Sequence, residues 1–444
     1  MGNYVPASEE ETKEMLDFLG LSSVDDLYRD VPRDVYRSRL PLPAGKSEME
    51  VIREIRKLGA KNRRFTSIFC GAGAYSHYIP AIVKQVISKE AFRTTYTPYQ
   101  AEISQGILQS IFEYQTMISE LTGMDVSNAS VYDGSTAAAE AIFMCLDRKK
   151  NSVLASGTMH PQVLEVMKTY CDSRHVDFHV IPVKEGRTDA EKLADMMGDG
   201  TAAVVFQNPN FFGLIEDGDA IISMAHGVKA KAVMSVSPLS LGILKTPGEY
   251  GADIAVGDGQ ELGLPLSFGG PYMGFMTCRE KLMRKLPGRI VGETTDSRGN
   301  RCYVLTLQAR EQHIRREKAS SNICSNEALC TMACGAYMAA LGPDGMKEAA
   351  SQCYAKAHYL AGELEKIGFT LKYKGPFFDE FVTASPIPPQ KVEEILEEKG
   401  ILGGLPVDGG ILWCATEMNS KEDMDEMVAI LKGGMGHGTS ILKW

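Results

Sequence analysis

The most informative segment of the chain is Tyr250-Gly-Ala-Asp-Ile-Ala-Val-Gly-Asp-Gly-Gln-Glu-Leu-Gly-Leu-Pro-Leu-Ser-Phe-Gly-Gly-Pro-Tyr-Met-Gly-Phe-Met276. Its pattern is typical of a strand, an exposed loop, a diglycine and a second strand. Gln260 stands in the loop. Its carboxamide can donate and accept hydrogen bonds, but the nitrogen lone pair is delocalised into the carbonyl. The loop therefore carries a hydrogen-bonding group and not a nucleophilic amine.

Upstream of this segment, helices alternate with short apolar strands. The predicted strands cover 152–156, 178–182, 202–207, 230–236 and 253–256, and the predicted helices between them include 162–170 and 217–226. Continuous apolar strands separated by helices indicate a mainly parallel sheet that is covered on both faces. The predicted fold class is therefore doubly wound α/β.

Both ends of the chain have their own patterns. Ser8 and Glu11 form a capping box for a first helix, and a second amphipathic helix is expected over 47–61. After a helix-rich region over 326–367, short strands and helices predict a compact α+β lobe. We expect four parts: an N-terminal helical arm and connector over 1–65, a large α/β domain over 66–325, a small C-terminal α+β domain over 326–432, and a frayed tail over 433–444.

Composition narrows the range of partners. The 444 residues are 44% apolar, enough for an ordinary core, and the net charge of −10 argues against nucleic-acid or membrane partners. The start of the chain lacks the pattern of a secretory signal, and no apolar run is long enough to span a bilayer, so we predict a cytoplasmic location. The ten cysteines are interpreted as reduced core residues, and the spacing of Cys324, Cys330 and Cys334 matches no common zinc motif, so no metal is expected.

Several longer motifs resemble those of one family. They include Gly257-Asp-Gly-Gln-Glu-Leu-Gly263 with Phe268-Gly-Gly-Pro271, and the segments 94–106, 112–117, 128–137, 207–210 and 316–324. On these motifs the chain resembles the P-protein of the glycine cleavage system, glycine dehydrogenase (decarboxylating), and within it the α-type subunits of the two-subunit bacterial form. The similarity covers nearly the whole chain.

The resemblance implies a fold, a reaction and partners. The fold is the aminotransferase-like fold of pyridoxal-phosphate enzymes (fold type I). The complex binds glycine through pyridoxal phosphate, releases CO2 and passes the aminomethyl group to the lipoyl arm of the H-protein. In the two-subunit form, the cofactor lysine belongs to the β-type subunit, and the expected assembly is α2β2.

Two departures from the usual cofactor site support the α-type assignment. Gln260 occupies the usual lysine position. The strand that ends in Val233-Met-Ser-Val-Ser-Pro238 also lacks the aspartate that holds the pyridine nitrogen protonated. The resemblance therefore implies a vestigial cofactor pocket in this chain. Ser135 and Thr136 open a helix at the position where the fold binds the cofactor phosphate. His160 either stacks on a cofactor ring or is a buried structural histidine. Gln260 completes the set of positions that match this pocket.

The resemblance also suggests residues that this chain lends to its partner's site. Tyr96, Tyr99 and Gln100 can orient a carboxylate or phosphate, or their rings can simply anchor the interface. Arg310 belongs to the densest basic cluster, which either binds a carboxylate or is merely solvated or paired.

Ser321 and Asn322 form a second candidate segment. They precede a helix, so they can donate to a phosphate across the interface or serve as ordinary caps.

Three alternatives remain open on the sequence. The chain could be a self-sufficient pyridoxal enzyme that uses another lysine, such as Lys245. It could be a scaffold subunit that contributes no catalytic group. It could also be an unrelated doubly wound binding protein. A nicotinamide site at 70–75 is rejected, because no strand precedes those glycines with dinucleotide-fold spacing.

Overall fold

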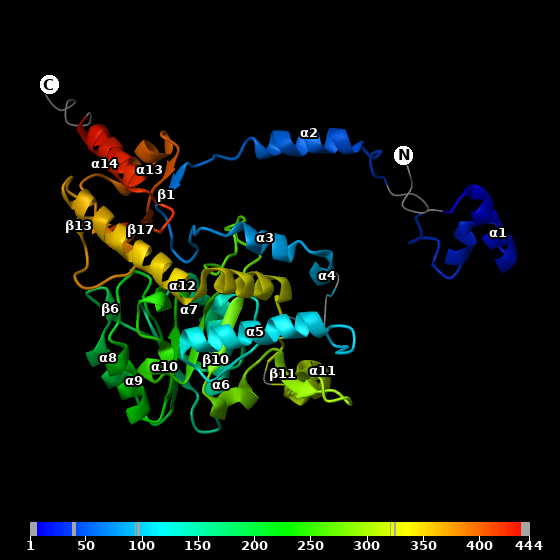
Figure 1. Cartoon of the computed structure of the whole chain (residues 1–444), viewed down its shortest axis with the longest axis horizontal. Helices are drawn as coiled ribbons and strands as arrows, with labels where there is room; N and C mark the ends of the chain where they lie inside the picture. Colours follow the sequence, from blue (N-terminus) through cyan, green and yellow to red (C-terminus); the bar gives the residue numbers. More distant parts are fainter. Residues whose placement is uncertain are drawn as a thin grey trace. The chain divides into compact units, whose positions relative to one another are not determined.

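The structure is a computed structural model that describes residues 7–37, 41–93, 95, 98–319, 321–323 and 326–436. The chain divides into two compact units, Met1–Arg63 and Arg64–Trp444 (Figure 1). Every buried apolar residue among the described residues belongs to the second unit. Tyr96 lies outside the described residues.

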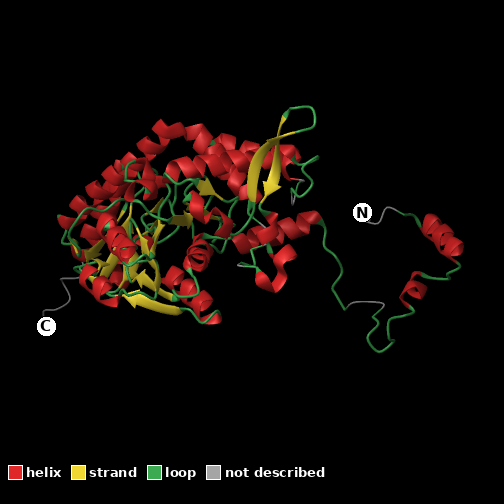
Figure 2. Ribbon diagram, turned by 90° about the horizontal axis from the view of Figure 1, so that it is seen from below, coloured by secondary structure: helices red, strands yellow, loops and turns green. Residues whose placement is uncertain are grey.

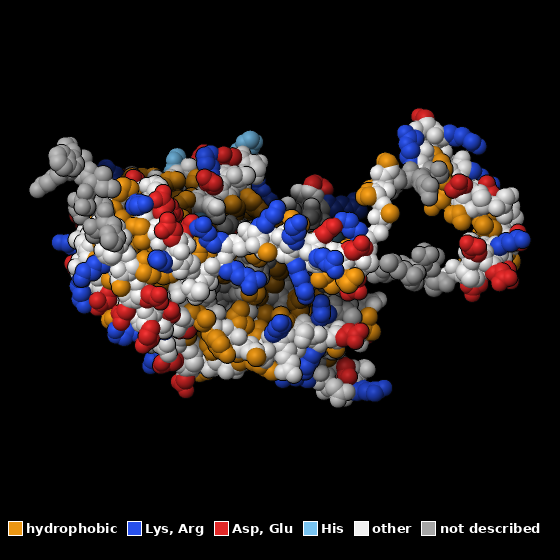
Figure 3. Space-filling model, turned by 90° about the horizontal axis from the view of Figure 1, so that it is seen from above, with side chains coloured by type: hydrophobic (Ala, Val, Ile, Leu, Met, Phe, Trp, Pro, Cys, Tyr) orange, Lys and Arg blue, Asp and Glu red, His pale blue; other side chains and the backbone are white. Residues whose placement is uncertain are grey.

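The first unit consists of helices without a core of their own. α1 (Glu9–Leu19) starts at the predicted capping box, in which the Ser8 Oγ accepts from the Glu11 nitrogen at 3.1 Å. A 3-10 turn η1 (Val24–Tyr28) and α2 (Glu48–Gly59) follow, which confirms both predicted helices. No residue of α1 or α2 is buried, and orange apolar side chains are visible among the charged ones on this N-terminal part (Figure 3).

The second unit is built on a seven-stranded sheet. Five neighbouring strands, β9, β8, β7, β3 and β4, are parallel to one another. The next strand, β10, is antiparallel to β9, and the edge strand β2 is antiparallel to β10. The predicted mainly parallel sheet is therefore confirmed. In spatial order the strands are β2 (Val126–Ser127), β10 (Gly274–Cys278), β9 (Ile254–Asp258), β8 (Lys231–Ser235), β7 (Thr201–Gln207), β3 (Ser152–Ser156) and β4 (Asp177–Ile181).

Helices cover both faces of this sheet because alternate strand residues point to opposite sides (Figure 2). Val153 and Ala155 of β3 pack with α6 (Gly134–Cys145) and α7 (Pro161–Ser173). Leu154, between them, packs into the other core with α5 (Gln105–Thr122), α9 (Gly218–Gly227) and the first part of α12. Two apolar faces per strand explain why the strands are continuous apolar runs.

α12 (Ala328–Glu365) joins the sheet to the C-terminal lobe (Figure 1). It is interrupted at Gly342, whose φ of 62° and ψ of 179° are non-helical, and Pro343 follows. The buried residues up to Cys353, on both sides of this kink, pack in the core of the large sheet, and those from Ala357 onward pack in the lobe. The change of core therefore falls inside α12, and not at its start.

The C-terminal lobe is an antiparallel sheet with two helices. The sheet has the order β13 (Thr370–Leu371), β14 (Glu380–Ala384), β17 (Gly410–Cys414) and β16 (Leu405–Val407), and the helices are α13 (Pro389–Glu397) and α14 (Lys421–Gly436). Its core includes Phe369, Phe381 and Trp413. α14 extends to Gly436, beyond the expected start of the tail, and the remaining residues lie outside the described part of the chain.

Several short elements had no counterpart in the sequence prediction. β11 (Ile290–Thr295) and β12 (Arg301–Thr306) form a hairpin, and β1 (Ser67–Ile68) pairs in parallel with β15 (Ile401–Leu402). The others are α3 (Ala81–Ile87), α4 (Glu90–Arg93), β5 (Val183–Lys184), β6 (Arg187–Thr188), α8 (Ala190–Met196), η2 (Leu239–Gly242), α10 (Pro247–Tyr250), η3 (Glu280–Lys285), η4 (Gln308–Arg310), α11 (Gln312–Arg315) and η5 (Arg316–Lys318). No described helix has the length and apolarity needed to cross a bilayer.

Candidate functional site

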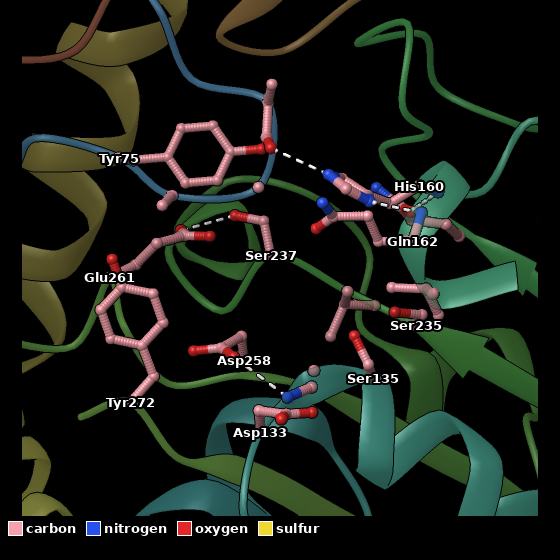
Figure 4. Close-up of a pocket in the computed structure, with 18 of the residues that line it drawn as sticks. Tyr75, Asp133, Ser135, His160, Gln162, Ser235, Ser237, Asp258, Glu261 and Tyr272 are labelled. Carbon is pink, nitrogen blue, oxygen red and sulfur yellow. Dashed lines mark hydrogen bonds between the residues drawn. The ribbon is translucent and has the colours of Figure 1, made fainter. Parts of the chain in front are cut away.

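A cavity of about 420 Å³ opens at the carboxyl ends of β3, β7, β8 and β9. The strand order reverses between β3 and β7, and in open α/β sheets ligands bind at such a switch point. The loop 72–75 and the start of α6 close its sides. Ser135 and His160, two of the predicted pocket residues, line this cavity (Figure 4).

Gln260 is a structural clamp behind this cavity. This residue is only 2% exposed. Its Oε1 accepts from the Tyr75 nitrogen at 2.7 Å, and its Nε2 donates to the carbonyls of Tyr75 and Leu264, both at 2.9 Å. The amide therefore ties the loop at Tyr75 to the segment between β9 and β10.

The start of α6 is surrounded by carboxylates. Asp133 caps the helix by accepting from the Thr136 nitrogen at 2.7 Å, and Thr136 is buried. Asp258, at the end of β9, accepts from the Gly134 nitrogen at 3.0 Å and from the Gln260 nitrogen at 2.9 Å. Burial raises the pKa of Asp258 to about 7, against the opposing effect of these two donors.

A further carboxyl group reaches the end of β8. The strand itself ends in serines, as the sequence shows, but Glu261 accepts from the Ser237 hydroxyl at 2.7 Å (Figure 4). Burial raises the pKa of Glu261. Sequence reasoning missed this residue, although its position directly after Gln260 placed it near the cavity.

His160 is held as a neutral ring. Its Nδ1 accepts from the Gln162 nitrogen at 3.2 Å, so Nε2 carries the proton and donates to the Ala72 carbonyl at 2.9 Å. Burial lowers the pKa of His160. The ring meets Phe211 edge-on, with centroids 5.1 Å apart. These contacts support the structural interpretation of this histidine.

The glycine at position 71 is explained by packing. Ala72 donates its N–H to Glu380 at 2.6 Å, and the Tyr75 hydroxyl donates to the same carboxyl group at 2.8 Å. A Cβ on Gly71 would lie 2.6 Å from both the Glu380 carboxylate and the Tyr75 ring. A residue without a Cβ at position 71 therefore lets this loop approach Glu380 closely.

The residues predicted to contribute to the partner's site do not line this cavity, as far as the structure describes them. The Tyr99 hydroxyl accepts from Arg289 at 2.7 Å, and the Arg289 guanidinium lies over the Tyr99 ring at 4.6 Å. Arg310 donates to the carbonyls of Leu286 and Gly288, the latter at 2.6 Å. Arg310 therefore braces the turn before β11.

The remaining members of this group are polar residues at the surface. The Ser321 hydroxyl accepts from the Ile323 nitrogen at 3.1 Å, while Gln100 and Asn322 are exposed. Sequence reasoning missed Arg289, which is 2% exposed and also donates to Asn326 at 3.1 Å. No spacing motif distinguishes Arg289 from other arginines, so only the fold reveals it.

Pyridoxal phosphate does not fit the cavity of this chain. Gln260 cannot form the imine, and the Gly134 N–H at the phosphate cradle is already bound by Asp258. Asp133, Asp258 and Glu261 line the cavity, and no lysine or arginine is among the described lining residues. A phosphate dianion would find no opposite charge here.

Comparison with known proteins decides the family. The family model described as the glycine cleavage system P-protein matches residues 2–431. The chain belongs to this family. It is 48% identical over 447 residues to a protein named probable glycine dehydrogenase (decarboxylating) subunit 1 of Desulfitobacterium hafniense, covering 98% of this chain and 99% of the relative. A protein of the same name from Moorella thermoacetica is 48% identical over 440 residues, covering 97% and 99%.

Solved structures agree with this assignment. A crystal structure of the glycine decarboxylase (P-protein) of the glycine cleavage system, in inhibitor-bound form, has a TM-score of 0.93 and is 42% identical to this P-protein chain. The match covers 97% of this chain and 100% of the chain in that structure. A Burkholderia pseudomallei sphingosine-1-phosphate lyase has a TM-score of 0.65 at 14% identity, covering 91% and 94%, and shows the fold alone. The predicted aminotransferase-like fold is confirmed, and pyridoxal phosphate is the cofactor to which this family points.

Proposed function

We propose that this chain is the α-type subunit of a two-subunit glycine dehydrogenase (decarboxylating), and that a β-type partner binds the pyridoxal phosphate covalently. Family membership and the names of the relatives support the subunit role. The observation that supports the division of labour is Gln260, whose amide is held by three backbone hydrogen bonds at the lysine position. This chain's own cavity therefore carries no step of the reaction.

The chain's contribution to the reaction is then made at the interface. Tyr99 is the strongest candidate, because its side chain is 49% exposed while its hydroxyl accepts from the buried Arg289. That hydrogen bond fixes the phenol and leaves the phenol's own proton available for an oxyanion on the partner's side. Gln100, Ser321 and Asn322 are further candidates for the same surface, and Arg310 is a weaker one because carbonyls engage its guanidinium.

The complete complex would act on glycine with further partners. We propose an α2β2 assembly that releases CO2 from glycine and transfers the aminomethyl group to the lipoyl group of the H-protein. The partner supplies the cofactor, which provides the electron sink for decarboxylation. The α-type chain completes and orients that site.

Co-expression with the β-type subunit tests this proposal directly. Exchange of labelled bicarbonate into glycine, measured with lipoylated H-protein, is expected to require both chains. Turnover by the α-type chain alone would contradict the division of labour. The Lys245→Ala variant addresses the remaining lysine alternative, which the geometry does not favour. The Lys245 Nζ lies 2.6 Å from Asp219, and Lys245 is not among the described lining residues of the cavity.

A scaffold role is separated from a catalytic one by Tyr99→Phe and Asn322→Ala. In complexes shown to be intact by sedimentation, the Tyr99→Phe change is expected to lower turnover at least about tenfold, as loss of an oriented donor does in other enzymes. Tyr354→Phe, at a tyrosine that is 39% exposed on α12, is the matched control. Unchanged turnover in both interface variants would favour a scaffold.

A further inference from the structure

An acidic side chain occupies the place where a phosphate would bind in this fold. The first amides of a helix have no partners within the helix and lie at the positive end of its dipole, so they attract anions. At α6, the Gly134 N–H donates to the Asp258 Oδ2 at 3.0 Å (Figure 4). Asp258 comes from β9, far from α6 in the sequence, and its other oxygen is held by the Gln260 nitrogen at 2.9 Å.

We infer that Asp258 is this chain's internal substitute for the cofactor phosphate, and that it excludes phosphate from the cavity independently of Gln260. The inference rests on the proposed function only because it takes position 260 as the lysine position. Asp258 uses one amide of the phosphate cradle and places a carboxylate beside the others. Asp133 uses the amide of Thr136 in the same turn.

The size of the cavity does not explain the exclusion. A volume of about 420 Å³ lies within the range of small-molecule sites. The lining explains it instead, because the Asp258 side chain already occupies the Gly134 amide, Asp133 and Glu261 also line the cavity, and no lysine or arginine is among the described lining residues to balance the charge of a phosphate. A Gln260→Lys change alone is therefore not enough to restore cofactor binding.

Inorganic phosphate tests the exclusion without any imine. The full chain is compared with its Asp258→Ser and Asp258→Asn variants by thermal unfolding in sodium phosphate and in sodium chloride of equal ionic strength. Asp217→Ser is the matched control, because Asp217 is an exposed acid that caps α9 by accepting from Ala220 at 3.1 Å. Both Asp258 variants are expected to gain a phosphate-dependent rise in Tm that the wild type and the control lack.

Pyridoxal phosphate tests the second half of the inference. Gln260→Lys is compared with Gln260→Lys combined with Asp258→Ser or Asp258→Asn, and borohydride-trapped label at residue 260 is measured by peptide mass spectrometry. The double variants are expected to take up at least about tenfold more label, a difference of ~1.4 kcal/mol in binding. Because Asp133 remains in place, the gain is expected to be incomplete.

Each contrary result has a distinct meaning. Full labelling of Gln260→Lys alone, or no phosphate response in either Asp258 variant, overturns this inference and leaves the proposed function intact. Covalent labelling of the wild-type chain by itself overturns the assignment of the cofactor to the partner as well. If Asp258→Ser does not fold, the isosteric Asp258→Asn variant carries the same comparison.

Discussion

Three hydrogen bonds join the Gln260 side chain to the backbone at Tyr75 and Leu264. A lysine in the same place would have no acceptor for the Tyr75 N–H, because an ammonium group only donates. The amide therefore suits a position that connects two segments, and the same property removes the nucleophile. At this residue, one amide group both makes the structural contact and is unable to form an imine.

Removing this clamp is expected to destabilise the chain. Gln260→Ala leaves the half-buried Tyr75 N–H and carbonyl and the buried Leu264 carbonyl without this partner, which should lower the free energy of unfolding by roughly 2–4 kcal/mol. Urea unfolding of the full chain measures it. Gln109→Ala is the control, since Gln109 is exposed and its side-chain amide donates to Glu113 at 2.8 Å. Equal stability of the two variants would show that the clamp contributes nothing.

The raised pKa of Asp258, about 7, makes stability depend on pH. An unfolded aspartate titrates near pH 3.9, so the folded chain holds this proton more tightly. The contribution of this proton to the free energy of unfolding is fully present below about pH 3.9 and is lost as the pH rises through about 7. Between pH 5 and pH 8, the wild type should lose roughly 2–3 kcal/mol more unfolding free energy than Asp258→Asn.

Urea unfolding at the two pH values checks this prediction. Asp217→Asn, at an exposed capping aspartate, should behave like the wild type. Burial also raises the pKa of Glu261 and of Glu380. The unfolding free energy of the Asp258→Asn variant should therefore still fall with rising pH, but less steeply than that of the wild type. An identical pH dependence of the unfolding free energy in the wild type and in Asp258→Asn would contradict a raised pKa at Asp258.

At the scale of elements, the core strands were predictable and the small ones were not. β3, β7 and β9 are apolar on both faces, so composition alone marks them. β1 and β15 have two residues each, and they pair only with each other, across a long separation in the sequence. The β11–β12 hairpin carries polar residues such as Glu293 and Arg301, which weaken the apolar signal.

The kink in α12 is an element-scale feature that glycine makes possible. Gly342 has φ 62° and ψ 179°, a region that side chains disfavour, although a Cβ at this position would have no atom within 4 Å. Gly342→Ala should therefore cost ~1–3 kcal/mol of unfolding free energy through backbone strain alone.

Gly362 in the same helix supplies the matched control. It lies in a regular helical turn, is exposed, and has open space around its Cβ position. Gly362→Ala should stabilise the chain by ~0.5–1 kcal/mol, because alanine favours the helix and restricts the unfolded chain. Chemical unfolding should move the two variants in opposite directions, and a shared direction would contradict the strain at Gly342.

At the scale of the whole molecule, the N-terminal unit lacks a core. Phe18 is 90% exposed and Ile55 is 61% exposed. Substituting such residues should change the stability of the isolated chain by less than ~0.5 kcal/mol. We expect these exposed apolar residues to contact the partner subunit, so Phe18→Ser should weaken assembly at least about tenfold.

Sedimentation of the co-expressed subunits measures that effect. Leu371→Ser, at a residue that is 37% exposed on β13, is the control outside the arm. Equal assembly by both variants would show that the apolar side chain of Phe18 makes no contact in the complex. A large loss of stability in the isolated Phe18→Ser chain would instead show that Phe18 packs within this chain.

The sequence by itself determined the order of the core strands and of the main helices, and the presence of an amide at position 260, because apolar periodicity, caps and residue chemistry are local properties. Only the tertiary structure decided which groups meet at the cavity and which group supports Tyr99 away from it. Asp258 reaches the start of α6, Glu261 reaches Ser237, and Arg289 supports Tyr99. These contacts join segments that are separate in the chain, and their geometry follows from how the sheet and its covering helices pack.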